Sequence, residues 1–505
     1  MRIMGDFLKA VLEGSDFWIG LGGDGERSGL KSCSCSECSK TEIELESDSG
    51  LGCEFSIDSR TIKKGEIYCA IPGARVDGHL FILQALKSGA AGLIIEKSGL
   101  NFLNDVPEKL LHGKLIICVE STVQSLIKLA YSWRSTFTCP IVGITGSLGK
   151  TTTKEMVKLI LKKAEKKALV SRGNYNTILG VSLSILKMNP EHEVGVFEIG
   201  INSKGEMAQI ADLLRPTIGA VTCVAHNHLE GLESTSEVAI EKCQLFKNFG
   251  ATDIGVVNGD QAELAERSFL CPVVKFGQKT KNQVQARKVR RVRSDEGEYK
   301  TNFRLKLYKT RVEVSLKGWH EGVVQNSLAA MAVSTVLGVE DAKIIAAVQE
   351  FSGVPERFET RLSADGKSLI ISDCYNASPE SMRAALEAVD AMHAEQKIAV
   401  LGDMLELGEK EIFWHRQVGR VFRHVRSFSH VILIGERAKF VAKTVPITLR
   451  TTTVESVQDA KELLGKIMKP GALVLVKASR AVGLNKLVDS MVKVVEEEKA
   501  VRVAI

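Results

Sequence analysis

Short apolar runs recur along the whole chain, separated by segments in which apolar residues follow helical spacing. In the first third the runs span residues 55–57, 67–71, 93–95 and 115–119, and in the centre they span 141–142, 195–199, 220–224 and 254–257. A further series covers 369–372, 397–401, 431–434 and 472–476. Strands that alternate with helices in this way predict α/β domains with mostly parallel sheets and helices on both faces.

One segment has a different period. Between residues 284 and 316 apolar and polar residues alternate, as in Phe303, Leu305 and Leu307, which predicts an antiparallel meander. The basic run at 287–293 lies in this segment. We interpret it as a solvated face of the meander rather than a nucleic-acid site, because stacking aromatic residues are not interleaved with it.

A chain of 505 residues is too long to fold around a single hydrophobic core, so several domains are expected. We predict three domains, at residues 1–138, 139–353 and 354–505. A segment rich in Gly, Ser, Glu and Cys, from about residue 21 to 52, predicts a flexible insertion in the first domain.

Composition narrows the class of protein. A hydrophobic content of 44%, a charged content of 25% and a net charge of +6 are ordinary for a soluble globular protein. An apolar run near twenty residues is missing, so we expect no membrane insertion, and the acidic residue near the N-terminus argues against a signal peptide. The charge suits anionic small molecules and does not argue for nucleic acid.

The eleven cysteines are scattered, several within apolar runs, which favours a reducing, cytoplasmic location. Four of them, Cys33, Cys35, Cys38 and Cys53, could be read as a metal cluster. Their uneven spacing among Ser and Gly favours a solvated loop with free thiols.

The stretch Gly143-Ile-Thr-Gly-Ser-Leu-Gly-Lys-Thr-Thr152 carries the clearest chemistry. It lies between a strand and a helix, where backbone N–H groups and the helix dipole form a cradle for a nucleotide polyphosphate. Lys150 is expected on the β- and γ-phosphates, and the Thr151 hydroxyl on Mg²⁺. The general pattern requires glycine at position 144, which is Ile144 here; Gly143 and Gly146 lie on either side.

Three polar residues downstream are candidates for the same site. Glu198 ends an apolar strand at the carboxyl edge, where doubly wound sheets bind ligands, and its carboxylate can take Mg²⁺. His228 follows the next strand, and Lys242 lies fourteen residues later on an expected helix. Each alone is more often a solvated or structural residue than a ligand.

Taken together, these residues resemble the ATP-dependent Mur ligases of peptidoglycan synthesis. The resemblance spans nearly the whole chain. In the first domain it rests on segments 58–61, 65–73 and 77–82, and in the centre on 145–152, 173–176, 198–207 and 228–231. In the last domain it rests on 373–382, 401–408 and 476–480. It implies a UDP-sugar-peptide-binding first domain, a central P-loop ATPase-type domain, and a Rossmann-like C-terminal domain that closes over ATP.

The resemblance also implies the chemistry. UDP-MurNAc-tripeptide would supply the carboxylate and D-Ala-D-Ala the amine, joined through an acyl-phosphate by a monomeric enzyme. Lys242 would be carbamylated by CO₂ and, with Thr151, Glu198 and His228, would hold Mg²⁺, two ions in all. Lys150, His228 and Lys242 are therefore the expected catalytic residues.

Further binding residues follow from the matched positions. Those expected at ATP are Thr145, Gly146, Ser147, Gly149, Lys150, Thr151, Thr152, Asn326, Arg357 and Asp373. Those expected at the other substrates are Ser59, Arg60, Asn174, Asn176, Tyr375 and Asn376.

The chain departs from the family pattern in two places. The family's Gly-x-His-Asn-x-x-Asn, which contacts adenine, reads Gly318-Trp-His-Glu-Gly-Val-Val-Gln-Asn326 here. The usual Asn-Asn is Asn176-Thr177. The sequence does not distinguish meso-diaminopimelate from lysine as the third residue of the peptide.

Three other functions compete with this interpretation. A phosphotransferase or NTP-driven switch would explain the phosphate loop but not His228, Lys242 or the motifs of the last domain. A non-catalytic binding protein with this fold would not need Lys150 and Glu198, which are both present. A sister ligase would carry a string different from Asp373-Cys-Tyr-Asn376.

Overall fold

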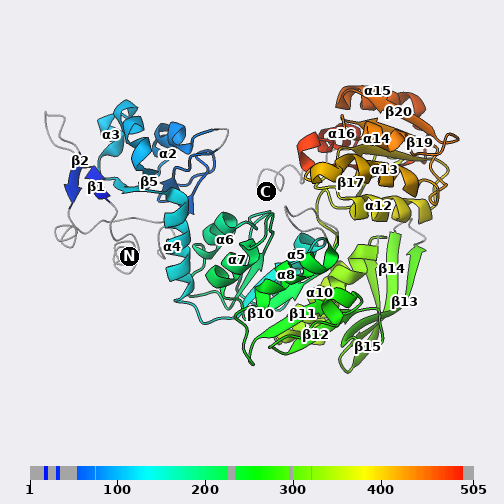
Figure 1. Cartoon of the computed structure of the whole chain (residues 1–505), viewed down its shortest axis with the longest axis horizontal. Coiled ribbons are helices and arrows are strands. Elements are labelled where there is room, and N and C mark those ends of the chain that lie inside the picture. Colours follow the sequence, from blue (N-terminus) through cyan, green and yellow to red (C-terminus); the bar gives the residue numbers. More distant parts are fainter. Residues whose placement is uncertain are drawn as a thin grey trace. The chain divides into compact units, whose positions relative to one another are not determined.

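A computed structural model describes residues 16–20, 30–33, 54–73, 76–225, 234–294, 299–319 and 321–492 (Figure 1). The chain divides into two compact units. The first comprises residues 1–141, 169–197 and 209–215, and the second comprises 142–168, 198–208 and 216–505. Three sheets organise the described residues, which confirms the predicted α/β class with mostly parallel sheets.

The first sheet has the order β2-β1-β6-β5-β4-β3. Its parallel part, β3 to β6, corresponds to the four apolar runs of the first third. The strands are β1 (Asp16–Gly20), β2 (Leu30–Cys33), β3 (Phe55–Ser56), β4 (Ile67–Cys69), β5 (Gly92–Glu96) and β6 (Leu115–Val119). The helices are η2 (Gly78–Phe81), α2 (Ile82–Lys87), η3 (Lys97–Asp105), α3 (Glu108–Leu111) and α4 (Thr122–Arg134).

Part of the expected flexible insertion is regular structure. Leu30–Cys33 forms β2, which pairs antiparallel with β1, and β1 pairs antiparallel with β6. The backbone groups of this segment therefore extend the sheet, which the Gly- and Ser-rich composition did not reveal. Cys35, Cys38 and Cys53 lie outside the described residues.

The second sheet has the order β15-β14-β13-β12-β11-β10-β7-β9-β8. β10 pairs parallel with both β7 and β11, and β12 continues the parallel part. The strands are β7 (Ile141–Thr145), β8 (Ala168–Val170), β9 (Val194–Glu198), β10 (Ile218–Val221), β11 (Ile254–Asn258), β12 (Val273–Gly277), β13 (Val284–Arg293), β14 (Tyr299–Leu307) and β15 (Thr310–Lys317).

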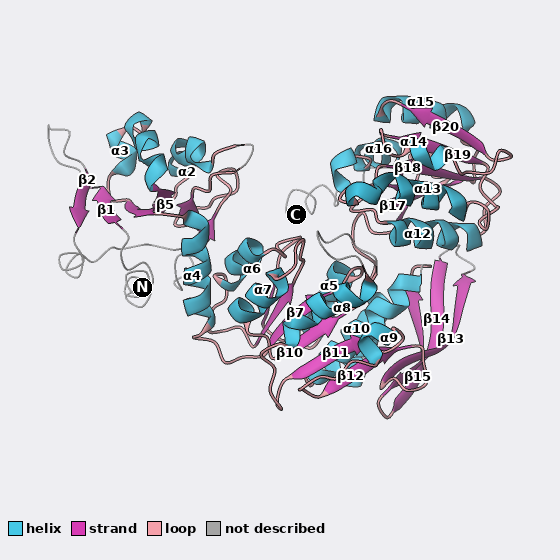
Figure 2. Ribbon diagram, viewed as in Figure 1, coloured by secondary structure: helices cyan, strands magenta, loops and turns pink. Residues whose placement is uncertain are grey.

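The helices of this part cover the parallel strands (Figure 2). They are α5 (Lys150–Lys163), α6 (Ile178–Ile185), α7 (Glu206–Leu214), α8 (Thr235–Cys243), η4 (Gln244–Phe246), α9 (Ala262–Ala265), α10 (Glu321–Val336) and α11 (Asp341–Glu350). The expected meander is confirmed, because β13, β14 and β15 pair antiparallel. Phe303, Leu305 and Leu307 are fully buried on its inner face.

The third sheet has the order β16-β17-β21-β18-β19-β20, parallel except for β16. The strands are β16 (Glu359–Leu362), β17 (Leu369–Asp373), β18 (Lys397–Gly402), β19 (His430–Ile434), β20 (Arg450–Val454) and β21 (Leu473–Lys477). The helices are α12 (Pro379–Ala391), η5 (Gly408–Lys410), α13 (Glu411–Val421), α14 (Lys439–Ala442), α15 (Val457–Ile467), η6 (Arg480–Val482) and α16 (Asn485–Met491).

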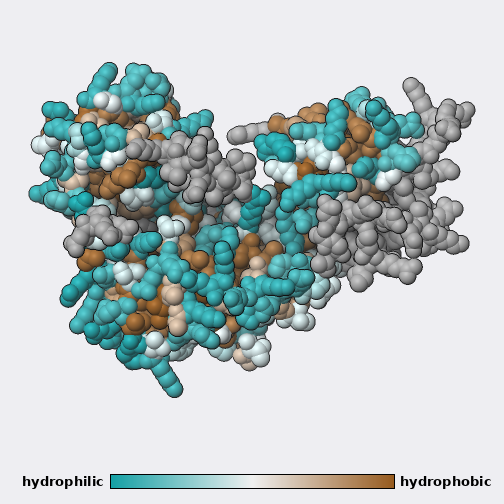
Figure 3. Space-filling model, turned by 180° about the vertical axis from the view of Figure 1, so that it is seen from behind, coloured by the Kyte–Doolittle hydropathy of each residue, from teal (hydrophilic) through white to brown (hydrophobic). Residues whose placement is uncertain are grey.

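Two hydrophobic clusters lie on the two faces of the third sheet. One joins it to α12, α13 and α14, and the other joins it to α15 and α16. This is the Rossmann-like arrangement that the family resemblance implies for the last domain. Hydrophilic side chains, interspersed with smaller apolar areas, cover the face in Figure 3. Among the helices that the structure describes, none is long and apolar enough to cross a membrane.

Candidate active site

The expected phosphate loop connects the end of β7 to the start of α5. Its backbone takes left-handed or otherwise unusual angles at two glycines, with φ of 150° at Gly146 and 83° at Gly149, which is the N-cap of α5. A side chain at either position would strain the backbone. Because Gly146 supplies the unusual angle, Ile144 can remain a buried residue of β7, and the altered pattern does not disturb the loop.

The neighbours of these glycines also leave no space. A Cβ atom on Gly146 would lie 1.9 Å from Thr222 Oγ1, and one on Gly149 would lie 2.1 Å from Asn326 Oδ1. Asn326, an expected ATP residue on α10, is therefore brought directly against the loop. The close approach gives the loop a compact form that only glycine permits.

β10 and the residues after it hold the loop in place. Ser147 N–H donates to Cys223 O at 2.8 Å, and the Thr222 hydroxyl donates to Leu148 O at 2.5 Å. Ser147 Oγ accepts a hydrogen bond from Ala225 N–H at 3.0 Å. These bonds pre-organise the loop backbone before any ligand is present.

Lys150 folds back over the loop. Its Nζ donates to Gly146 O at 2.8 Å and to Ser147 O at 3.4 Å. Burial lowers the pKa of this lysine, and the nearby Glu198 carboxylate acts in the opposite direction. The ammonium thus lies over the cradle in which a polyphosphate is expected, with Thr151 and Thr152 following in the first turn of α5.

Glu198 is the last residue of β9 and is almost fully buried. Its Oε2 lies 3.5 Å from Nζ of Lys154, a lysine on α5 that is itself fully buried and also lies 3.2 Å from Glu155 Oε1. Sequence reasoning missed Lys154. Its signal was the spacing of four residues from Lys150, which places the two lysines on one side of the helix.

Lys242 lies on α8, with 2% of its surface exposed. Burial, and then repulsion from Lys150, lowers the pKa of its amine to about 7. The adjacent Glu241 carboxylate points elsewhere and accepts the backbone N–H groups of Gly205 and Met207 at 2.9 and 3.2 Å. The amine of Lys242 therefore exists partly in its neutral form near neutral pH.

The expected ligand set is only partly placed. His228 lies outside the described residues. Within the described part of the chain, no group of three or more His, Cys, Asp and Glu residues is arranged to hold a metal. The oxygen donors of Thr151 and Glu198 have the hard character that Mg²⁺ prefers.

Arg357, which precedes β16 in the chain, contacts the first turn of α5 directly after the phosphate loop. Its Nη2 donates to Thr151 Oγ1 at 2.8 Å, and its guanidinium lies 4.0 Å above the centre of the Tyr375 ring. The residues on either side, Glu356 and Phe358, have φ of 59° and 52°, an uncommon conformation for side chains of this size. Two such residues in one short loop show that the backbone is strained where it holds Arg357 against Thr151.

Asp373 and Tyr375 stand at the carboxyl end of β17. Asp373 Oδ2 lies 2.7 Å from Lys477 Nζ, and Asp373 Oδ1 accepts a hydrogen bond from Phe358 N–H at 3.2 Å. Lys477 Nζ also donates to Asn376 O at 2.9 Å. The carboxylate thus anchors the Arg357 loop. Lys477 lies in the matched segment 476–480, but sequence reasoning missed it as a site residue.

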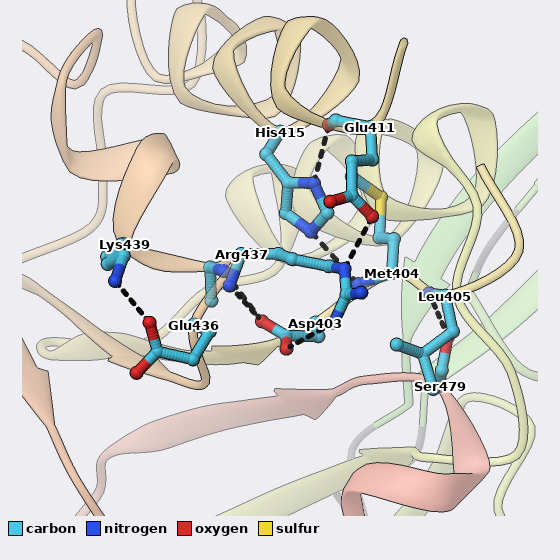
Figure 4. Close-up of polar contacts among 10 residues, drawn as sticks. Asp403, Met404, Leu405, Glu411, His415, Glu436, Arg437, Lys439 and Ser479 are labelled. Carbon is cyan, nitrogen blue, oxygen red and sulfur yellow. Dashed lines mark hydrogen bonds and ion pairs between the residues drawn. The ribbon is translucent and has the colours of Figure 1, made fainter. Parts of the chain in front are cut away.

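The motif at 401–408 follows β18 and is held by the polar network in Figure 4. Asp403 Oδ1 accepts the backbone N–H groups of Arg437 and Ala438 at 3.0 and 2.6 Å. Gly435, with φ of 113°, leaves the space, because a Cβ there would lie 2.4 Å from Asp403 Oδ1. Asp403 O accepts Ser479 N–H at 3.0 Å, so one residue connects the ends of β18, β19 and β21.

A buried histidine completes this network (Figure 4). His415 Nε2 accepts Met404 N–H at 3.0 Å, so its Nδ1 carries the proton and donates to Glu411 O at 2.7 Å. Burial lowers the pKa of His415, which agrees with a neutral ring. Glu411 also forms an ion pair with the Arg437 side chain.

The remaining expected substrate residues belong to the first unit. Ser59 is buried and donates to Gln84 Oε1 at 3.1 Å, whereas Arg60 is exposed and forms an ion pair with Asp58 at 2.7 Å. Asn174 is exposed and Asn176 half-buried, and Asn176 N–H donates to Asn174 O at 2.7 Å. Their roles stay predictions.

Comparison with known families accounts for this arrangement. The Mur ligase family catalytic domain matches residues 54–133, the Mur ligase middle domain matches 144–334, and the Mur ligase glutamate ligase domain matches 356–480. A relative from Treponema pallidum is 31% identical over 437 residues, covering 86% of this chain and 92% of the relative. The chain therefore belongs to the Mur ligase family, with the three-domain architecture expected from its sequence.

Several relatives within the family are one type of enzyme. The relative from Treponema pallidum and one from Bacillus subtilis, 29% identical over 86% of this chain and 92% of its own, are UDP-N-acetylmuramoyl-tripeptide–D-alanyl-D-alanine ligases, the MurF type. MurF from Thermotoga maritima in complex with ADP superposes with a TM-score of 0.72 at 28% identity, covering 86% of this chain and 96% of its own. MurF from Acinetobacter baumannii, 23% identical, shares the fold with a TM-score of 0.76.

Proposed function

We propose that this protein is the ATP-dependent ligase that joins D-Ala-D-Ala to UDP-MurNAc-tripeptide, giving UDP-MurNAc-pentapeptide, ADP and phosphate. The observation that carries the proposal is the contact between Arg357 and Thr151. It brings the Tyr375-Asn376 segment and the phosphate loop into one unit, so the motifs that resemble the MurF type adjoin a nucleotide site.

In the first step the carboxylate of the tripeptide attacks the γ-phosphorus of ATP, and ADP leaves. The loop N–H groups and Lys150 bind the phosphates, and Arg357 stabilises the charge that develops on the transferred group. When bound, Mg²⁺ would neutralise phosphate charge, held by Thr151, Glu198, His228 and carbamylated Lys242.

In the second step the amine of D-Ala-D-Ala attacks the acyl carbon, phosphate leaves, and the nitrogen loses a proton. The Asp403 network supports this step indirectly, because it holds the backbone at the carboxyl ends of three strands, where sheets of this kind bind ligands. Exclusion of water at this point would protect the acyl-phosphate from hydrolysis.

The carbamate on Lys242 is supported by burial and by the pKa of about 7. Carbamylation joins CO₂ to a neutral amine and releases a proton, so a lysine of ordinary pKa would react poorly. The product is an anion with hard oxygen donors, whereas the ammonium would repel Mg²⁺. Cys69, Cys139, Cys223, Cys243, Cys271 and Cys374 form no disulfide bond, which supports work in a reducing cytoplasm.

The test is phosphate release measured over a matrix of UDP-MurNAc-peptides and amine acceptors, with the product identified by mass spectrometry. We expect turnover only when ATP, Mg²⁺, a UDP-MurNAc-tripeptide and D-Ala-D-Ala are all present. A product extended by one amino acid would reassign the chain to a sister ligase. Phosphate release without an amide product would support a phosphotransferase or an NTP-driven switch.

A further inference from the structure

The outer face of the β13–β15 meander is strongly basic. The strand register places seven basic side chains and one acidic side chain on this face, which we call the basic face. Its charged members are Arg287, Arg290, Lys300, Arg304, Lys306, Arg311, Lys317 and Glu313. Arg291 and Arg293 pair with Thr301 and Tyr299, so they belong to the opposite side.

Cations stand directly opposite one another on this face. Arg287 pairs with Arg304, Lys306 with Arg311, and Lys300 with Lys317. Like charges at directly opposed positions destabilise a sheet. An ion pair between Arg304 and Glu313 at 3.0 Å offsets part of this repulsion. Folding alone would be served better by alternating charges, so the pattern points to a role other than stability.

The basic face also concentrates the charge of the protein. Seven cations and one anion give it a formal charge of +6, which equals the net charge of the whole 505-residue chain. The other charged residues of the sequence therefore balance. An uneven distribution of this kind produces a local positive potential rather than a uniformly basic surface.

The face is available because the core lies on the other side of the meander. Phe303, Leu305 and Leu307 are fully buried there, and α10 and α11 contact these strands. On the outer side Arg287, Arg290, Arg304, Arg311 and Lys317 are exposed, and Lys300 and Lys306 are half-buried.

We propose that the basic face docks the protein on a membrane surface rich in anionic phospholipids. The face is a sheet surface that presents cations from three adjacent strands, which suits a planar array of phosphate groups. Each Lys or Arg near such a surface strengthens binding by about fivefold. The eight residues of the basic face include no aromatic side chain on which a base could stack, and they lie on strands rather than on a helix that could enter a groove. Nucleic acid therefore fits this face less well than a membrane surface does.

The experiment uses the full chain and sedimentation with vesicles. We expect binding to phosphatidylcholine vesicles that contain about one-third phosphatidylglycerol, and at least about tenfold weaker binding to phosphatidylcholine alone. Raising NaCl from about 50 mM to about 0.5 M should release the protein, because salt screens exposed charges.

Two triple variants with the same change in net charge locate the surface. The first carries Arg290→Glu, Lys300→Glu and Lys317→Glu on the basic face. The second carries Arg423→Glu, Lys461→Glu and Lys466→Glu, at exposed positions in the last domain. The first should lose at least about tenfold in affinity and the second should remain within about twofold of the unchanged protein. Both should keep phosphate-release activity in solution, which shows that they are folded.

Three results would overturn the proposal. In the first, the protein fails to sediment with phosphatidylglycerol vesicles at low salt, and in the second, the two triple variants lose equal affinity for the vesicles. The third result is tighter binding to duplex DNA or RNA than to vesicles at equal phosphate concentration. The last would assign the face to nucleic acid. None of these outcomes affects the proposed ligase reaction, which is measured without vesicles.

Discussion

Arg357 donates a hydrogen bond from Nη2 to the hydroxyl of Thr151 at 2.8 Å, across 206 positions of sequence. Thr151 is the residue whose hydroxyl is expected on Mg²⁺, and Arg357 comes from the start of the last domain. The guanidinium is held from the other side by the Tyr375 ring, which Arg480 also approaches, at 5.1 Å. The guanidinium cation therefore lies beside Thr151, directly after the phosphate loop.

Replacing Arg357 by lysine should lower kcat by about 100-fold or more. Lysine keeps the charge but has no planar group to stack on Tyr375 while it donates toward the loop. Tyr375→Phe retains the ring, so its kcat at saturating substrates should stay within about threefold of wild type, since a phenyl face also attracts the cation. Steady-state phosphate release measures both. A normal kcat in Arg357→Lys would mean that Arg357 only connects the domains.

Lys150→Ala should reduce turnover by about 10³-fold without a change in melting temperature. The substitution removes a cation from the phosphate cradle, and the bonds it makes are to two loop carbonyls at the site itself. Lys158→Ala, at an exposed position of the same helix, is the matched control and should behave like wild type. Turnover near normal in Lys150→Ala would show that ATP binds elsewhere.

Gly149→Ala should weaken nucleotide binding by about tenfold or more. Its φ of 83° strains any side chain, and the new methyl group would displace Asn326. Gly471→Ala is the control for the stability cost of a methyl group at positive φ, because Gly471 has φ of 82° and open space around it. Calorimetric titration with a non-hydrolysable ATP analogue should show the loss in the first variant only. Equal affinities would contradict the assigned contact between the loop and α10.

Lys242→Ala should be nearly inactive and should recover part of its rate when a short carboxylic acid is added in millimolar amounts. The acid would occupy the space left by the carbamate and offer oxygen ligands to Mg²⁺. Lys242→Arg should stay inactive with or without the acid, because a guanidinium can neither react with CO₂ nor bind a cation. Full activity in either variant excludes the carbamate.

Acidification should loosen the 401–408 motif before the rest of the domain. The pKa of His415 is lowered in the folded protein, mainly by burial, from its ordinary value of 6.5. Above pH 6.5 the ring is neutral in both states, so the bond from Met404 N–H contributes fully. As the pH falls below that value the unfolded chain takes up a proton that the folded ring resists, and stability decreases.

Hydrogen exchange of the Met404 amide, corrected for the intrinsic rate, measures this effect. Its protection should decrease between about pH 6.5 and 5 in the wild type. In His415→Gln the side chain can still accept and donate but does not titrate, so the decrease should be smaller. Identical pH profiles would show that His415 does not control the motif.

Much of the fold could be predicted from local patterns. Each of the apolar runs coincides with a strand, because central strands of parallel sheets are buried on both faces and must be apolar. The strands that sequence reasoning missed include β20, Arg450–Val454, at the edge of the third sheet, and β2, Leu30–Cys33, at the edge of the first. Edge strands are partly solvated, so their residues need no apolar run.

The sequence by itself determined the chemistry that depends on neighbouring residues. Gly146, Gly149 and Lys150 form the phosphate loop because backbone angles and the start of a helix are local properties. Tertiary structure decided the rest. The pairing of Lys154 with Glu198, the bond from Arg357 to Thr151 and the opposed cations of Arg287 and Arg304 all require distant segments in register. Burial, which gives Lys242 its pKa of about 7, is likewise a property of the packed molecule and not of any segment.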